Sequence, residues 1–127
     1  MFPNQREWER TENFGMLPQH CYFIPFDGAD APQDERTASS RMELLNGEWQ
    51  FRAHARPEDC ELEEPLPDFV RVPACVQLCG YDVPLYTNHN YPFPYDPPYI
   101  AADIPVFHYR RTFRPKRAGA RLVFEGV

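Results

Sequence analysis

The segment Asn46-Gly47-Glu48-Trp49-Gln50-Phe51-Arg52-Ala53-His54 carries the pattern that decides the fold. Its first two residues, Asn-Gly, are a strong turn signal. Apolar side chains then occupy positions 49, 51 and 53, and polar side chains occupy positions 50, 52 and 54. A period of two is typical of a β-strand that buries one face. The segment therefore predicts a turn followed by a half-buried strand.

Further strands are predicted on both sides of long irregular segments. Residues 69–73 read Phe-Val-Arg-Val-Pro, a short strand that ends at proline. Residues 107–114 alternate again, with Phe107, Tyr109 and Phe113 on one face, and residues 121–127 form an apolar run after a turn at 115–119. The intervening segment 56–67 is acidic and interrupted by proline, which favours a loop. We find no convincing amphipathic helix.

Short strands separated by proline-rich and glycine-rich turns indicate an all-β fold. We predict a partial jelly roll or β-sandwich of the galactose-binding kind over residues 41–127, preceded by an irregular N-terminal arm over residues 1–40. Too few strands are present to close a sandwich. We therefore expect an N-terminal fragment, truncated within the domain. The alternative is a complete small domain with a shortened sandwich.

Composition excludes several classes of function. The 127 residues include 15 prolines and are 15% aromatic, and the formal net charge is −6. A disordered chain is poor in aromatic residues, and a nucleic-acid-binding domain needs a basic surface. No apolar run approaches the length of a membrane span, and no signal peptide is recognisable at residues 1–10. We therefore expect no nucleic-acid or membrane partner and a cytoplasmic location.

The segment Gly80–Pro98 is the candidate binding loop. It is rich in Tyr, Pro, Asn and Asp, and prolines at this density exclude a helix. Long ordered loops often line binding sites. Aromatic faces with amide and carboxylate groups suit a carbohydrate, which offers flat C–H faces and paired hydroxyls.

Ordered motifs along the chain resemble the N-terminal sugar-binding domain of β-galactosidases in glycoside hydrolase family 2. They are Leu-Asn-Gly-x-Trp-x-Phe at 45–51, Val-Pro at 72–73, Gly-Tyr-Asp-x-Pro-x-Tyr-Thr-Asn at 80–88, Tyr-Pro at 91–92, Asp-Pro-Pro at 96–98 and Tyr-x-x-x-Phe at 109–113. Arg6–Glu9 and Pro18–His20 look like the family's N-terminal arm. The resemblance spans nearly the whole chain in the family's order.

The resemblance implies a parent enzyme that hydrolyses terminal β-D-galactosides such as lactose with retention of configuration. In the family, the two catalytic glutamates lie in a separate barrel domain, so we assign no catalytic residue to this chain and predict that it is inactive alone. The resemblance further implies Mg²⁺ and Na⁺ for the full-length enzyme, none of them bound by this chain alone. The implied partners are a β-galactoside sugar, the barrel domain and, at full length, further copies in a homo-oligomer contacted by the arm.

Asn88 is the one substrate-binding residue that we carry over. In the family, the Asn of Tyr-Thr-Asn reaches into the active site and hydrogen-bonds the galactose, and an amide offers a sugar both donors and an acceptor. From the residues alone, Asn88 also fits a turn-closing amide, and His89 beside it fits either a ligand contact or a structural donor. Asp82 and Asp96 could be imagined as an acid/base pair, but aspartate in such a loop usually bonds its own backbone.

The sequence departs from the family at several positions of this region. Cys75-Val76 stands where the family has Asn-Trp, and Cys79 and His89 replace its usual residues. The set Cys75, Cys79 and His89 does not match the common zinc spacings, so we expect no metal ligand in the chain and free thiols. The alternative function is a stand-alone carbohydrate-binding module without hydrolase activity.

Overall fold

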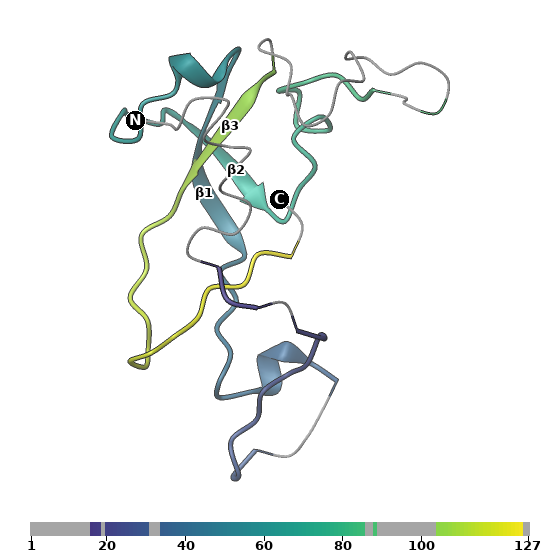
Figure 1. Ribbon diagram of the computed structural model, residues 1–127, viewed down its shortest axis with the longest axis vertical. Coiled ribbons are helices and arrows are strands. Elements are labelled where there is room, and N and C mark those ends of the chain that lie inside the picture. The colour runs from purple at the N-terminus through teal and green to yellow at the C-terminus, as the bar shows by residue number, and fades with distance from the viewer. Residues whose placement is uncertain (1–15, 19, 31–33, 86–87, 89–103, 126–127) are drawn as a thin grey trace.

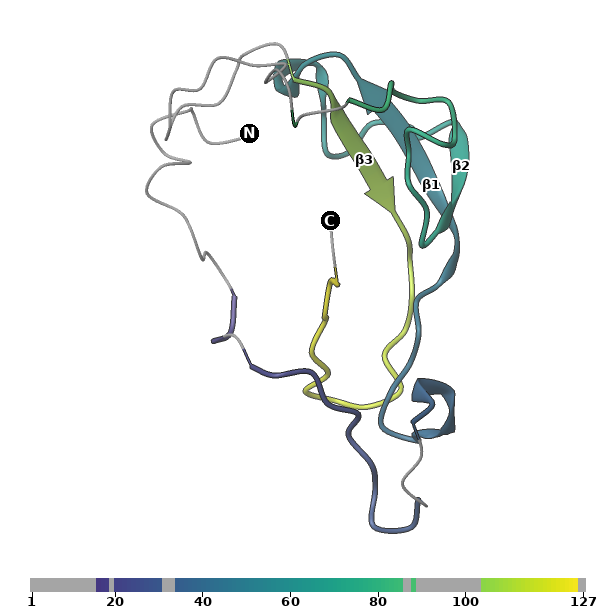
Figure 2. The ribbon, with the colours of Figure 1, turned by 90° about the vertical axis from the view of Figure 1, so that its right-hand side faces the viewer.

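Figure 1 shows the computed structural model of the chain, which describes residues 16–18, 20–30, 34–85, 88 and 104–125. Strand β1 (Gly47–His54) lies between β2 (Asp68–Val72) and β3 (Val106–Arg110) in one antiparallel sheet of order β2-β1-β3. The sheet occupies one end of the molecule, and residues 16–46 extend towards the other end (Figures 1 and 2). The described helical segments are two short 3₁₀ turns, η1 (Arg36–Ala38) and η2 (Pro57–Asp59). The all-β class is confirmed.

Strand β1 begins where the turn signal predicted it. Gly47 has φ +126°, a conformation that side-chain-bearing residues rarely adopt. Gly47 pairs with Val72 of β2, and Phe51 pairs with both Asp68 of β2 and Tyr109 of β3. Successive residues of a strand point to opposite faces. The register therefore places Phe51 and Tyr109 on one face of the sheet, and Arg52 with its β3 partner His108 on the other.

The small core lies on the Phe51 face. Phe51 is fully buried, and Val70 and Val76 are nearly so. The Phe51 ring centroid lies 4.4 Å from that of Tyr81 and 4.9 Å from that of Tyr109, and Phe107 and Val72 pack around the same cluster. These distances fall in the range of favourable aromatic pairs. Three strands and the segment after β2 thus share one apolar centre.

The third and fourth predicted strands need correction. Strand β3 ends at Arg110. The next residue, Arg111, instead extends its guanidinium to the carbonyl oxygens of Leu45 and Asn46, at 2.7 and 2.8 Å. The predicted strand at 121–127 is wrong over its described part, residues 121–125, which form no strand. Leu122, Val123 and Phe124 are 57%, 66% and 66% exposed, and an extended segment becomes a strand only where a neighbour accepts its ladder of hydrogen bonds.

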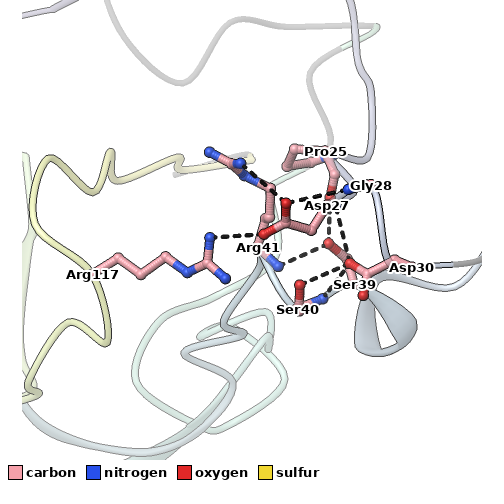
Figure 3. A network of polar contacts seen from close by, with 8 residues as sticks. All are labelled: Pro25, Asp27, Gly28, Asp30, Ser39, Ser40, Arg41 and Arg117. Carbon is pink, nitrogen blue, oxygen red and sulfur yellow. Dashed lines mark hydrogen bonds and ion pairs between the residues drawn. The ribbon is translucent and has the colours of Figure 1, made fainter.

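The described part of the N-terminal region is held to later residues by polar contacts. Figure 3 shows the Asp30 carboxylate accepting hydrogen bonds from the backbone of Asp27 and from the backbone and hydroxyl of Ser40. The Asp27 carboxylate accepts one from Arg117 at 3.1 Å. These contacts hold the pKa of both carboxyl groups below the usual value. Because both residues are only partly buried, the contacts order this turn more than they stabilise the fold.

Within the described residues, no helix has the length and apolar character needed to cross a membrane.

Candidate functional site

The segment after β2 is a compact turn that holds the candidate binding loop against the sheet. The amide of Cys79 donates to the carbonyl of Val76 at 3.0 Å, and the amides of Gly80 and Tyr81 donate to Gln77 and Val76. Gly80 has φ +85°, which suits glycine at the end of such a turn. Val76 is buried, and the Tyr81 ring packs against Phe51 in a tilted arrangement. The start of the predicted loop is therefore anchored in the core by two side chains.

Asn88 lies seven residues beyond this anchor, in an exposed turn. The Asp82 carboxylate accepts a hydrogen bond from the next amide, that of Val83, at 2.8 Å. This is the backbone-bonding role expected for an aspartate in such a loop, and it does not favour Asp82 as a catalytic acid or base. His89 and Asp96 lie outside the described residues. Asn88 itself is exposed, and its contact with sugar stays a prediction.

The two cysteines of this segment are both exposed. The Cys75 thiol donates to the side-chain oxygen of Gln77 at 2.9 Å. Neither Cys75 nor Cys79 belongs to the group of metal-ligating side chains that the described residues bring together. All four cysteines are free thiols, as predicted.

A second polar site lies on the opposite face of the sheet, and the sequence analysis missed it. Four side chains converge there: His54 from β1, His108 from β3, and Cys60 and Glu64 from the loop between β1 and β2. One potential ligand atom of each lies within 4.8 Å of all the others. His54 and Cys60 are buried, and the side chains of Glu64 and His108 are about as enclosed, at 11% and 10% exposed.

The loop that carries Cys60 and Glu64 is fastened to the sheet by arginines. After η2, the amide of Cys60 donates to the carbonyl of Pro57 and turns the chain back. Arg110 of β3 donates to the backbone carbonyls of Leu62 and Glu64, and Arg52 of β1 forms an ion pair with Glu64 at 3.0 Å. Two arginines, one from each of two neighbouring strands, thus close this loop on the sheet.

Electrostatics keep the Glu64 carboxylate charged. Burial alone raises its pKa, but the hydrogen bond from His108 and the charges of His54 and Arg52 outweigh that effect and lower it. The Cys60 thiol shows the opposite shift. Burial, together with the negative charge of Glu64, raises its pKa. The chain therefore holds a carboxylate and a thiol side by side among two imidazoles.

The spacing of the cluster explains why sequence reasoning missed it. His54 and Cys60 are separated by five residues and Cys60 and Glu64 by three, which matches no common zinc pattern. His108 joins them because the β1–β3 register pairs it with Arg52, which is two residues from His54 and on the same face of β1. Alternation did predict both histidines on the polar faces of their strands. The pairing of the two strands was the missing information.

Comparison with known proteins agrees with an all-β sugar-binding domain. Residues 42–127 match the family described as glycosyl hydrolases family 2, sugar binding domain. The chain belongs to this family. The match includes the whole three-stranded sheet and both sites described above.

Individual relatives carry the name β-galactosidase. The chain is 40% identical to the β-galactosidase of Pectobacterium atrosepticum over 136 residues. It is 36% identical to that of Yersinia enterocolitica over 135 residues and 36% identical to that of Actinobacillus pleuropneumoniae over 137 residues. At least 97% of this chain is covered in each comparison, but only 13% of each relative. The chain thus spans about one eighth of the length of these enzymes.

Proposed function

We propose that this chain is the N-terminal part of a β-galactosidase that hydrolyses terminal β-D-galactosides such as lactose. The observation that carries the proposal is the match to β-galactosidases over nearly the whole chain, in which the sugar-binding domain covers residues 42–127. Residues 41–127 supply the start of the sugar-binding domain, and residues 1–40 form an arm that contributes to assembly. The enzyme acts in the cytoplasm, and its oligomer brings several copies together.

In this proposal the chain binds and positions the sugar, and the chemistry takes place elsewhere. Retaining hydrolysis needs two carboxyl groups about 5 Å apart, and the family resemblance assigns these to a downstream barrel domain. Mg²⁺ and Na⁺ act with that larger enzyme. The chain alone is inactive. Its task is to hold the amide of Asn88, through the anchor formed by Val76 and Tyr81, where it reaches a galactose hydroxyl.

A chimaera tests both the parentage and the role of Asn88. The matching N-terminal segment of the Pectobacterium enzyme is replaced by this chain, and hydrolysis of a chromogenic galactoside is measured. We expect an active enzyme. Removing one partner of a buried polar contact costs about 1–3 kcal/mol, so Asn88→Ala is expected to lower kcat/KM about 5- to 150-fold.

The matched control is Asn90→Ala, which removes an amide two residues further along and is expected to leave kcat/KM within about twofold. A folded but inactive chimaera with the natural Asn88 argues against the parentage. An active chimaera in which Asn88→Ala behaves like Asn90→Ala keeps the parentage and removes the assigned contact.

The alternative is a stand-alone carbohydrate-binding module, because a loop rich in Tyr and Pro on a β scaffold also suits that function. To test this alternative, the isolated 127-residue chain is titrated with galactose and lactose while tryptophan and tyrosine fluorescence are recorded. We expect no saturable signal at millimolar sugar, because a single amide cannot orient a sugar without a second wall. Saturable binding by the isolated chain favours the module.

A further inference from the structure

We propose that His54, Cys60, Glu64 and His108 form a structural zinc site that ties the loop between β1 and β2 to the sheet. The site lies on the face of the sheet opposite to the Phe51 core, so it does not depend on the proposed sugar binding. It also departs from our expectation, from the sequence, of no metal ligand in this chain.

The distances between the ligand atoms are close to the edges of a zinc tetrahedron. With Zn–N and Zn–O of about 2.0–2.2 Å and Zn–S of about 2.3 Å, tetrahedral geometry places N and O about 3.4 Å apart and S and N about 3.6 Å apart. His108 Nδ1 lies 3.4 Å from Glu64 Oε1 and 3.7 Å from Cys60 Sγ. Two edges of such a tetrahedron, both from His108 Nδ1, therefore already have coordination length, and all four ligand atoms lie within 4.8 Å of one another.

The fourth group, His54, supplies an independent observation. Its side chain is 5% exposed, and its Nε2 lies 2.7 Å from Glu64 Oε1. The two atoms are thus in ion-pair contact, but their alignment does not meet hydrogen-bond geometry, so Nε2 makes no well-formed hydrogen bond. A metal ion between the two atoms would satisfy both and widen their spacing towards a tetrahedral edge.

Ligand chemistry and charge select the ion. Two neutral imidazoles, a thiolate and a carboxylate carry a total charge of −2, which a divalent cation neutralises. A thiolate disfavours Mg²⁺ and Ca²⁺, and a mixed N, S and O set in a closed four-ligand site suits Zn²⁺. The second carboxylate oxygen of Glu64 is paired with Arg52 at 3.0 Å. Such an outer partner orients the carboxylate so that Oε1 faces the histidines.

Enclosure points to a structural role. All four side chains are largely buried, and catalytic zinc sites instead keep an open position for water. The ligands come from β1, the loop and β3, so one ion would join three segments that are up to 54 positions apart in the sequence. In a domain with a core as small as the Phe51 cluster, such a link adds stability that apolar burial does not supply.

Cobalt titration of the full 127-residue chain tests the proposal directly. Co²⁺ bound tetrahedrally with one thiolate gives a strong visible absorption and a thiolate-to-cobalt charge-transfer band in the near ultraviolet. We expect one equivalent of Co²⁺ to produce both, and Zn²⁺ to displace it. Cys60→Ser is expected to abolish the charge-transfer band, and His108→Ala to weaken metal affinity at least about 100-fold, the upper end of the effect of outer-shell changes.

Cys75→Ser and Cys79→Ser are the matched controls, because they remove exposed thiols from the other face and should leave the spectrum unchanged. A second readout covers variants that fold poorly. Zn²⁺ is expected to raise the melting temperature of the natural chain, and a chelator to reverse the rise, with neither effect in Cys60→Ser. The proposal is overturned by an octahedral spectrum without the charge-transfer band, or by a band that survives Cys60→Ser and is lost in Cys75→Ser.

Discussion

Replacing Phe51 by alanine is the sharpest perturbation of this fold. Phe51 is 0% exposed and touches side chains from both neighbouring strands and from the anchored turn. Phe→Ala in a core costs about 3–5 kcal/mol, and loss of the edge-to-face and tilted pairs with Tyr109 and Tyr81 falls within that total. A typical domain has a margin of about 5–15 kcal/mol. We therefore expect Phe51→Ala to remove between about a fifth and all of the free energy of unfolding.

Phe69→Ala is the control, since Phe69 lies on β2 of the same sheet but points to the other face and is 61% exposed. Its expected cost is within about 0.5 kcal/mol, as for other surface changes. The assay is urea unfolding followed by circular dichroism and tryptophan fluorescence. Phe51→Leu, which keeps part of the apolar volume, provides a measurable intermediate if the alanine variant does not fold. Equal midpoints for Phe51→Ala and Phe69→Ala would refute the assignment of the core.

Three further predictions use the same chain. Gly47→Ala is expected to lower the melting temperature, because φ +126° strains any residue with a side chain and the added Cβ would approach the Arg111 guanidinium to 3.3 Å. The control is Gly28→Ala, because Gly28 has open space around it. An unchanged melting temperature in Gly47→Ala would contradict this prediction. The folded-state pKa of Asp30 is lowered from 3.8. The ionised carboxylate therefore adds to the free energy of unfolding above about pH 4, and this stabilisation is lost as the pH falls below that value. Asp30→Asn should therefore reduce the drop in melting temperature on acidification, and an identical pH profile would count against it. The isolated chain is expected to show no galactosidase activity above a no-protein blank, and turnover that co-purifies with the chain would disprove this.

The alternation of apolar and polar residues predicted β1 and the buried position of Phe51, because a strand with one buried face has an apolar residue at every second position. It also placed Phe107 and Tyr109 on one face of β3. The same pattern failed at 121–125, where Leu122 and Phe124 are apolar but exposed. Hydrophobicity shows that a segment suits a strand, but only a hydrogen-bonding neighbour makes it one.

The sequence predicted the candidate site at Asn88 but not the cluster of His54, Cys60, Glu64 and His108. Asn88 was assigned through the ordered motifs around it, and its neighbours Asp82 and Val83 show the local backbone bonding typical of such loops. The His54 cluster depends on which residue of β3 stands opposite which residue of β1. A long-range register of this kind leaves no mark within either strand, because each histidine alone looks like a polar residue on an outward face.

The position of β1 between its two partners has a consequence for folding fidelity. Shifting an antiparallel pairing by one residue exchanges the two faces of a strand. For β1 and β3, such a slip would push Phe51 towards the Cys60–Glu64 loop and would bring His54 or Arg52 into the aromatic centre. Such a slip would be unfavourable on both faces. On one face the aromatic rings would lose their burial, and on the other a charged or polar side chain would be buried without a partner. The register of β1 is thus specified on both faces. Loss of apolar burial disfavours a misaligned pairing on one face, and burial of unpaired polar groups disfavours it on the other.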